Sequence, residues 1–304
     1  MISAILKMSR PVNIVIASVT LIIGYYLIDA FSASLPETGH LTQWNLALQI
    51  LGFTFAIAFA NIHNDILDYK SDCLNQPKRP LPSNQISTKQ AKVVATLFAA
   101  LSILCGVFDT IILLCTNKFS IIISLIPSFF FIILFAFLFC YNVKLKHIPL
   151  LKNMMVAFLC STPLILNWIY PTGNERSIGL LYPAMMFAFL LTTTREILKD
   201  LEDETGDLVA GIMTFPLIAG SKMARNFALA ILIFTWMLLP LPVIQGFYPM
   251  LFLILSAATL TPLFAIIIKN ANAKNYKKAQ TLVKVSMFAG LVSLVAAKTC
   301  SIFS

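Results

Sequence analysis

Long apolar stretches separated by short polar segments make up most of the chain. Each stretch is close to the about 20 residues that a helix needs to cross a bilayer core. The pattern therefore predicts an all-α, polytopic membrane protein whose nine transmembrane helices surround a lipid-accessible chamber, with helical cytoplasmic loops. The predicted spans are residues 12–31, 46–66, 93–112, 121–141, 154–170, 178–198, 227–247, 249–268 and 281–303.

Composition supports this fold class. The chain has 304 residues, of which 59% are hydrophobic and 12% are charged, whereas a soluble domain carries about 25% charged residues. The formal net charge of +9 is spread among the apolar stretches and forms no basic domain, which excludes a nucleic-acid-binding protein. The six cysteines contain no C-x-x-C pair, so we infer neither redox nor zinc chemistry.

The distribution of Lys and Arg predicts the orientation in the membrane, because loops rich in these residues remain cytoplasmic. Of the 22 Lys and Arg residues, all but Lys118, Arg176 and Lys298 fall on the side of the N-terminus. We therefore expect a multi-pass protein of the cell (plasma) membrane with a cytoplasmic N-terminus.

The acidic residues are concentrated in two short segments on that same side. Ionised groups near lipid are costly and tend to mark function. Asp29, Glu37, Asp109 and Glu175 lie near span ends or loops on the opposite side, where solvation is the simple explanation. The two segments hold Asp65, Asp68 and Asp72, and Glu196, Asp200, Glu202, Asp203, Glu204 and Asp207.

Both segments repeat one spacing, D-x-x-D-x-x-x-D. On a helix, steps of three and four residues place side chains on one face, where like charges repel unless cations bind between them. Oxygen ligands favour Mg²⁺, which commonly shares its coordination shell with phosphate oxygens. The alternative is a pair of solvated helix ends with salt bridges, but the matched spacing favours two clusters that hold one diphosphate through Mg²⁺.

The residues around these clusters resemble a family signature. The segment from Asn64 to Leu81, N-D-x-x-D-x-x-x-D-x-x-N-x-P-x-R-P-L, is similar to the first motif of the UbiA superfamily of intramembrane prenyltransferases. The segment from Asp200 to Asp207 is similar to its second motif. Arg10-Pro11-x-Asn13 and the segment from Tyr141 to Lys146, followed by Asn153, also match. The resemblance covers essentially the whole chain and implies a single domain over residues 1–304.

The resemblance implies transfer of a polyprenyl group from its diphosphate to a membrane-embedded acceptor, with Mg²⁺ as cofactor. The amino-acid sequences of both motifs are similar to those of the branch that forms the second ether bond of archaeal-type lipids. That branch implies geranylgeranyl diphosphate as donor and geranylgeranylglyceryl phosphate as acceptor. Phe215 and Pro216 depart slightly from the sequence that is typical of that branch. Membrane lipids are the surroundings, and we infer neither a protein nor a nucleic-acid partner.

These inferences assign roles to individual residues. Aromatic residues are too numerous for one to be singled out as catalytic, no general base is identified, and His63 is expected to be a satisfied helix-end imidazole. The catalytic residues are predicted to be Asp65, Asp68, Asp72, Asp200, Asp203 and Asp207. The metal ligands among and beside them are Asn64, Asp68, Asp72, Asp203 and Asp207. The predicted diphosphate-binding residues are Lys70, Arg79, Lys146, Arg195 and Lys199, and the predicted acceptor-binding residues are Arg10, Asn13, Tyr141 and Asn153.

Two other functions fit parts of the pattern. Prenylation of an aromatic acceptor in quinone biosynthesis would use the same aspartates. A multi-helix cation transporter built from repeats would also carry two acidic segments. The acids lie at predicted helix ends rather than at broken mid-span helices, which argues against the transporter.

Overall fold

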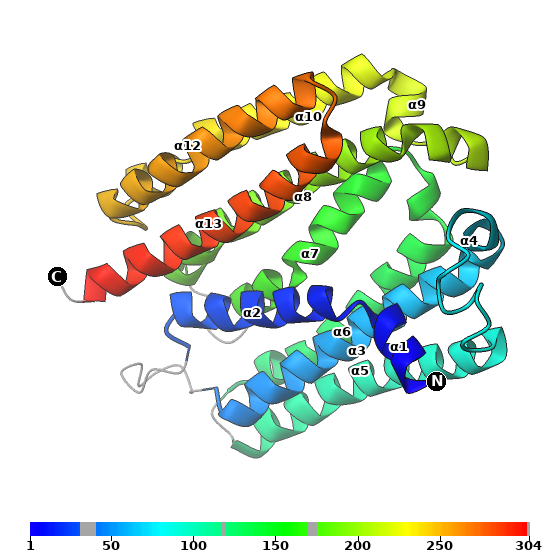
Figure 1. The fold of residues 1–304 in the computed structure, drawn as a ribbon. Helices are drawn as coiled ribbons and strands as arrows, with labels where there is room; N and C mark the ends of the chain where they lie inside the picture. The colour runs from blue at the N-terminus through cyan, green and yellow to red at the C-terminus, as the bar shows by residue number, and fades with distance from the viewer. Residues whose placement is uncertain (31–40, 117–118, 170–174, 303–304) are drawn as a thin grey trace. The chain divides into compact units, whose positions relative to one another are not determined.

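The computed structural model describes residues 1–30, 41–116, 119–169 and 175–302, and its regular elements in these ranges are all helical (Figure 1). The predicted all-α class is therefore confirmed. The chain forms two compact units, Met1–Lys144 with Leu166–Gly173, and Leu145–Ile165 with Asn174–Ser304. The single domain expected over the whole chain remains a prediction.

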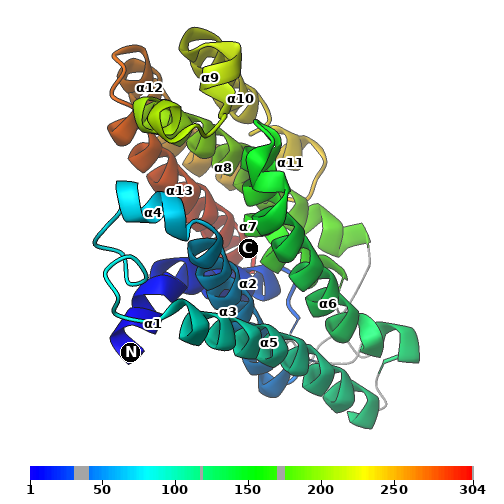
Figure 2. The same ribbon diagram turned by 90° about the vertical axis from the view of Figure 1, so that its right-hand side faces the viewer.

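The first unit is built around α3, which packs against α1, α2, α5 and α6 (Figure 2). Small residues permit this packing: Gly52 of α3 and Gly106 of α5 both lie against the ring of Phe131 on α6. The helices of this unit are α1 Ile2–Ser9, α2 Pro11–Leu27, α3 Gln43–Leu67, α4 Tyr69–Asn75, α5 Thr88–Thr116 and α6 Ile121–Val143.

A bend of 54° separates α1 from α2. Arg10 at the bend has a positive φ of 52°, which ends α1, and Pro11 begins α2, where its fixed φ suits the first helical position. The bend places the Arg10 side chain close to the end of α3 in the same unit.

The second unit is built around α8, a helix of 36 residues that packs against α9, α10 and α13. Helix α12 packs against α10 and α13. The elements are η1 Leu145–His147, α7 Leu151–Ile169, α8 Glu175–Ala210, α9 Phe215–Ala219, α10 Ser221–Met237, α11 Leu241–Ile244, α12 Met250–Asn272 and α13 Tyr276–Ile302. The last residues of α7 belong to the first unit.

Seven helices in the described ranges are long and apolar enough to cross a membrane, and the bent α1–α2 pair makes an eighth candidate. The predicted count of nine is not confirmed. A helix does occupy each predicted stretch, but α7, at the fifth, is less apolar because it contains Lys152, Asn153 and Asn167. The chain is an integral membrane protein by these helices.

The prediction that Asp109 is solvated near the end of a span was wrong. The residue lies inside α5 with 0% of its surface exposed. Asn45 and Gln49, one turn apart on α3, donate to its two carboxylate oxygens at 2.6 Å and 2.8 Å. Buried carboxylates need such donors, so this contact stabilises the packing of α3 on α5.

Candidate active site

The first acidic motif spans the junction between α3 and α4. Asn64 and Asp65 lie in the last turn of α3, Asp68 is the residue between the helices, and Asp72 lies in α4. The backbone N–H groups of Asp68 and Asp72 donate to the carbonyls of Asn64 and Asp68 at 2.9 Å and 2.8 Å. The helical step thus continues through the junction, which keeps the motif's residues one turn apart.

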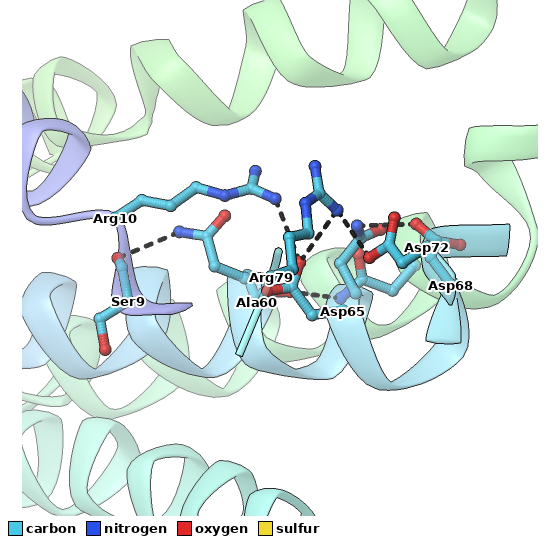
Figure 3. Close-up of polar contacts among 10 residues, drawn as sticks. Ser9, Arg10, Ala60, Asp65, Asp68, Asp72 and Arg79 are labelled. Atoms are coloured by element: carbon cyan, nitrogen blue, oxygen red, sulfur yellow. Dashed lines mark hydrogen bonds and ion pairs between the residues drawn. The ribbon is translucent and has the colours of Figure 1, made fainter. Parts of the chain in front are cut away.

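Two of the three carboxylates of this motif form ion pairs with arginines (Figure 3). Arg79 Nη1 lies 2.7 Å from Asp72 Oδ2 and 3.7 Å from Asp65 Oδ1, so one guanidinium bridges both acids. Arg10 Nη2 lies 3.3 Å from the same Asp65 oxygen. The third carboxylate, Asp68, accepts a hydrogen bond of 2.9 Å from the Asn64 amide. These contacts therefore reduce the repulsion among the acids.

A folded loop holds Arg79 in this position. The backbone N–H of Arg79 donates to the carbonyl of Gln76 at 2.9 Å, and that of Gln85 donates to the carbonyl of Pro80 at 2.9 Å. Leu81 and Ile86 are buried and anchor the loop. The sequence predicted a role for Arg79 in binding diphosphate, and the structure places its side chain, which is 36% exposed, directly on the first motif.

The second acidic motif lies on continuous helix near the end of α8. Asp200 is buried, Asp207 is half-buried and Asp203 is exposed. The three side chains therefore differ in access to solvent although they share a spacing. Asp203 and Asp207 are the carboxylates that remain open to a ligand in solution.

Two residues of α7 contact the carboxylate of Asp200. Lys152 Nζ lies 2.9 Å from Oδ1, and Asn153 Nδ2 donates to Oδ2 at 2.9 Å. Asn153 is predicted to bind the acceptor, and its amide nitrogen contacts Asp200 of the second motif. Lys152 was not predicted as a site residue. Its position next to Asn153 in the sequence was the available signal.

The other predicted residues lie at helix ends or on helix surfaces. Asn13 is exposed in the first turn of α2, and Lys70 is exposed in α4. Tyr141, near the end of α6, and Lys146, in η1, are half-buried. In α8, Arg195 is half-buried and Lys199 is exposed. Each therefore keeps part of its surface accessible.

His63 is packed rather than poised as a base. Its ring stacks between Phe59 and Phe139, with centroid distances of 5.3 Å and 5.4 Å. Asn142 lies 3.2 Å from His63 Nδ1, and its amide nitrogen also donates to the carbonyl of Ala60 at 2.9 Å. This environment agrees with the expected satisfied imidazole.

The donor set of each motif suits a hard cation that is shared with a substrate. Among the described residues, no group of three or more His, Cys, Asp or Glu side chains is arranged to hold a metal ion by itself. Mg²⁺ seldom uses such cages, since it is held by one or two carboxylates, waters and substrate phosphates. The side chains of Asn64 and Asp68, whose Nδ2 and Oδ2 atoms lie 2.9 Å apart, provide only carboxylate and amide groups, which fits this way of binding Mg²⁺.

Comparison with known proteins gives consistent matches over nearly the whole chain. The UbiA prenyltransferase family matches residues 19–292. The digeranylgeranylglyceryl phosphate synthase of Methanobrevibacter smithii is 32% identical over 290 residues, which cover 93% of this chain and 94% of the relative. The synthase of the same name from Thermococcus kodakarensis is 30% identical, with 97% of each chain covered.

Solved structures share the fold. A structure described for digeranylgeranylglyceryl phosphate synthase in membranes has a TM-score of 0.73 at 24% identity and covers 98% of both chains. A UbiA homologue from Archaeoglobus fulgidus bound to GPP and Mg²⁺ has a TM-score of 0.60 at 18% identity, covering 97% of this chain and 99% of that one. At these identities the likeness shows the fold.

Proposed function

Because the chain belongs to the UbiA prenyltransferase family, we propose that it transfers a geranylgeranyl group from its diphosphate to geranylgeranylglyceryl phosphate. The observation that carries this proposal is the full-length similarity to several curated synthases of one name. The predicted family and the predicted enzyme class, a prenyltransferase, are confirmed. The product is an ether lipid in which the acceptor hydroxyl oxygen replaces diphosphate on the allylic carbon.

The acidic motifs provide the groups that hold Mg²⁺ and diphosphate. Asn64, Asp68 and Asp72 would hold the ion at the first motif, and Asp203 and Asp207 at the second. When bound, Mg²⁺ neutralises the charge that develops on the leaving diphosphate. GPP and Mg²⁺ are bound together in the solved homologue, which supports this cofactor.

Asp65 and Asp200 have a different role in the proposed site. Each is buried, and each already contacts a basic side chain, Arg10 and Arg79 for Asp65 and Lys152 for Asp200. Asp72 is likewise buried and paired with Arg79, so it would share this arginine with the ion that it holds. They orient the surrounding basic and amide groups before substrate binds. Such preorganised groups cost little reorganisation during the reaction.

Basic side chains complete the binding of phosphate groups. Arg79 is held on the first motif yet remains partly exposed, so its other nitrogens are available to diphosphate oxygens. Lys70 and Lys146 are proposed for the same diphosphate; the sequence predicted this role for Arg195 and Lys199 as well. Arg10, Asn13, Tyr141 and Asn153 are proposed for the acceptor.

The proposed reaction takes place at the cytoplasmic side. Nearly all Lys and Arg residues lie in the same set of connections as the N-terminus and the two acidic segments, which supports this orientation. The apolar helices accept the prenyl chains from the bilayer and exclude water from the allylic cation.

One assay tests the proposed function against its alternatives. Purified protein in detergent receives labelled geranylgeranyl diphosphate, Mg²⁺ and either geranylgeranylglyceryl phosphate or an aromatic quinone precursor. We expect pyrophosphate release and a labelled ether lipid with the glyceryl phosphate alone. A labelled aromatic product instead would support quinone biosynthesis, and the absence of any prenyl transfer would contradict the proposal.

A further inference from the structure

Three basic side chains gather on α8 and α13, next to the second motif. A hydrogen bond from Gln280 on α13 to Glu202 on α8 sets the register of these packed helices. Figure 1 shows α13 beginning near the end of α8 and running back along it. Four residues further along α13, Lys284 is therefore level with a point between Arg195 and Lys199 on α8.

These basic groups lack sufficient acidic partners. In the described ranges, neither Lys199 nor Lys284 has an ion pair within 4.0 Å, and Arg195 pairs only with its neighbour Glu196. The Nε atom of Arg195 is buried and has no hydrogen-bond partner there. Lys284 is repelled electrostatically by Arg195 and Lys199 and attracted by Glu196. Lys199 is also attracted by Asp203 and Asp207, whereas Arg195 and Lys284 share Glu196 alone among the described acidic residues. The cluster formed by Arg195, Lys199 and Lys284 thus has more positive charge than Glu196 can neutralise.

Lys284 is exposed in the structure, but its position inside an apolar helix that is long enough to cross a membrane argues against simple solvation. It follows the first residue of α13, Tyr276, by eight positions, which is about 12 Å along the helix. Lys277 and Lys278 at the helix start reach water without this cost. A basic side chain that is set into an apolar helix beside two like charges is unfavourable unless an anion binds there.

We propose that Lys284, together with Arg195 and Lys199, binds the phosphate group of the membrane-embedded acceptor. This inference rests on the proposed function, and it gives Arg195 and Lys199 the acceptor phosphate rather than the donor diphosphate. A diphosphate that is bound through Mg²⁺ requires carboxylates, whereas a phosphate monoester is matched by basic groups alone. Arg195 and Lys199 lie within about one or two turns of Asp203, so a short glycerol unit places its hydroxyl near the second motif.

Steady-state kinetics of Lys284→Gln test this site, with both substrates varied separately. We expect the KM for the acceptor to rise about tenfold, as is typical for loss of a charged hydrogen bond, while the KM for the donor changes less than about twofold. Lys284→Arg should retain most of the acceptor affinity. Lys278→Gln, which removes an exposed lysine near the start of the same helix, should behave as wild type. The acceptor alcohol without its phosphate should bind wild type and Lys284→Gln equally.

Other outcomes overturn the assignment. A rise in the KM for the donor alone would assign the cluster to diphosphate. An effect seen only in vesicles with anionic lipid, and absent in neutral detergent, would assign it to a lipid headgroup. Equal effects of Lys278→Gln and Lys284→Gln would show general surface electrostatics. If wild type forms no ether lipid, the proposed function fails instead, and a matched unfolding midpoint verifies that each variant is folded.

Discussion

Asn153 donates a hydrogen bond of 2.9 Å from its side-chain amide to Asp200, which joins α7 to α8 within the second unit. A carboxylate only accepts hydrogen bonds, so this contact fixes the orientation of the Asn153 amide. Lys152 lies on the other oxygen of the same carboxylate. The buried acid of the second motif is therefore a link between helices.

Removing one partner of this link should be more harmful than removing both charges. Lys152→Met leaves the buried Asp200 carboxylate without its basic partner, and we expect the free energy of unfolding to fall by about 1–3 kcal/mol. The double variant Lys152→Met with Asp200→Asn should recover part of that loss. Unfolding in detergent, followed by size-exclusion chromatography, measures both. Equal stability of the single and double variants would contradict the structural role of the pair.

The accessible acids of the two motifs should be needed for turnover and not for folding. Asp203→Ala is expected to reduce turnover by at least about 10²-fold with little change in unfolding temperature, because the exposed side chain serves the metal and not the packing. Asp68→Ala should likewise abolish turnover in a protein that still folds and inserts into membranes. Product formation at saturating Mg²⁺ and donor gives the rate. Full activity in both variants would remove the metal-binding assignment.

The bridge that Arg79 makes between Asp65 and Asp72 requires a forked side chain. Lysine retains the charge but contacts only one acid well, so Arg79→Lys should raise the KM for the donor about tenfold while the protein remains folded. Lys78→Ala, at the neighbouring exposed position, is the matched control and should have wild-type kinetics. Wild-type donor affinity in Arg79→Lys would show that the bridge has no part in binding.

Helix packing in the first unit should be sensitive to a single methyl group. A Cβ atom at Gly106 would lie 2.8 Å from the carbonyl oxygen of Pro127, a backbone atom that cannot move aside, so Gly106→Ala should destabilise by about 1–3 kcal/mol. Gly290→Ala on α13 is the control, since its Cβ would meet only Leu260 Cδ1 at 3.9 Å. That variant should be neutral or slightly stabilising, because alanine favours helix. Thermal unfolding of the two variants decides.

The sequence predicted the chemical groups of the candidate site, but it did not predict the contacts of several other charged residues. Asp109 was assigned to solvent because it lies near the end of an apolar stretch, whereas α5 continues past it and α3 supplies two amides. Lys152 and Lys284 were counted only as cytoplasmic basic residues. Lys152 contacts Asp200, and Lys284 lies within α13 beside α8. These contacts join residues far apart in sequence, which local patterns do not encode.

The sequence by itself determined the membrane class, the helical content and the two acidic motifs, because apolar length and helical spacing are local properties. Only the tertiary structure decided which acids are paired with basic side chains. Asp65 and Asp72 share Arg79, Asp200 has Lys152, and Asp203 stays exposed, although all belong to two copies of one spacing. The physical reason is that a carboxylate's burial and partners depend on which helix packs beside it.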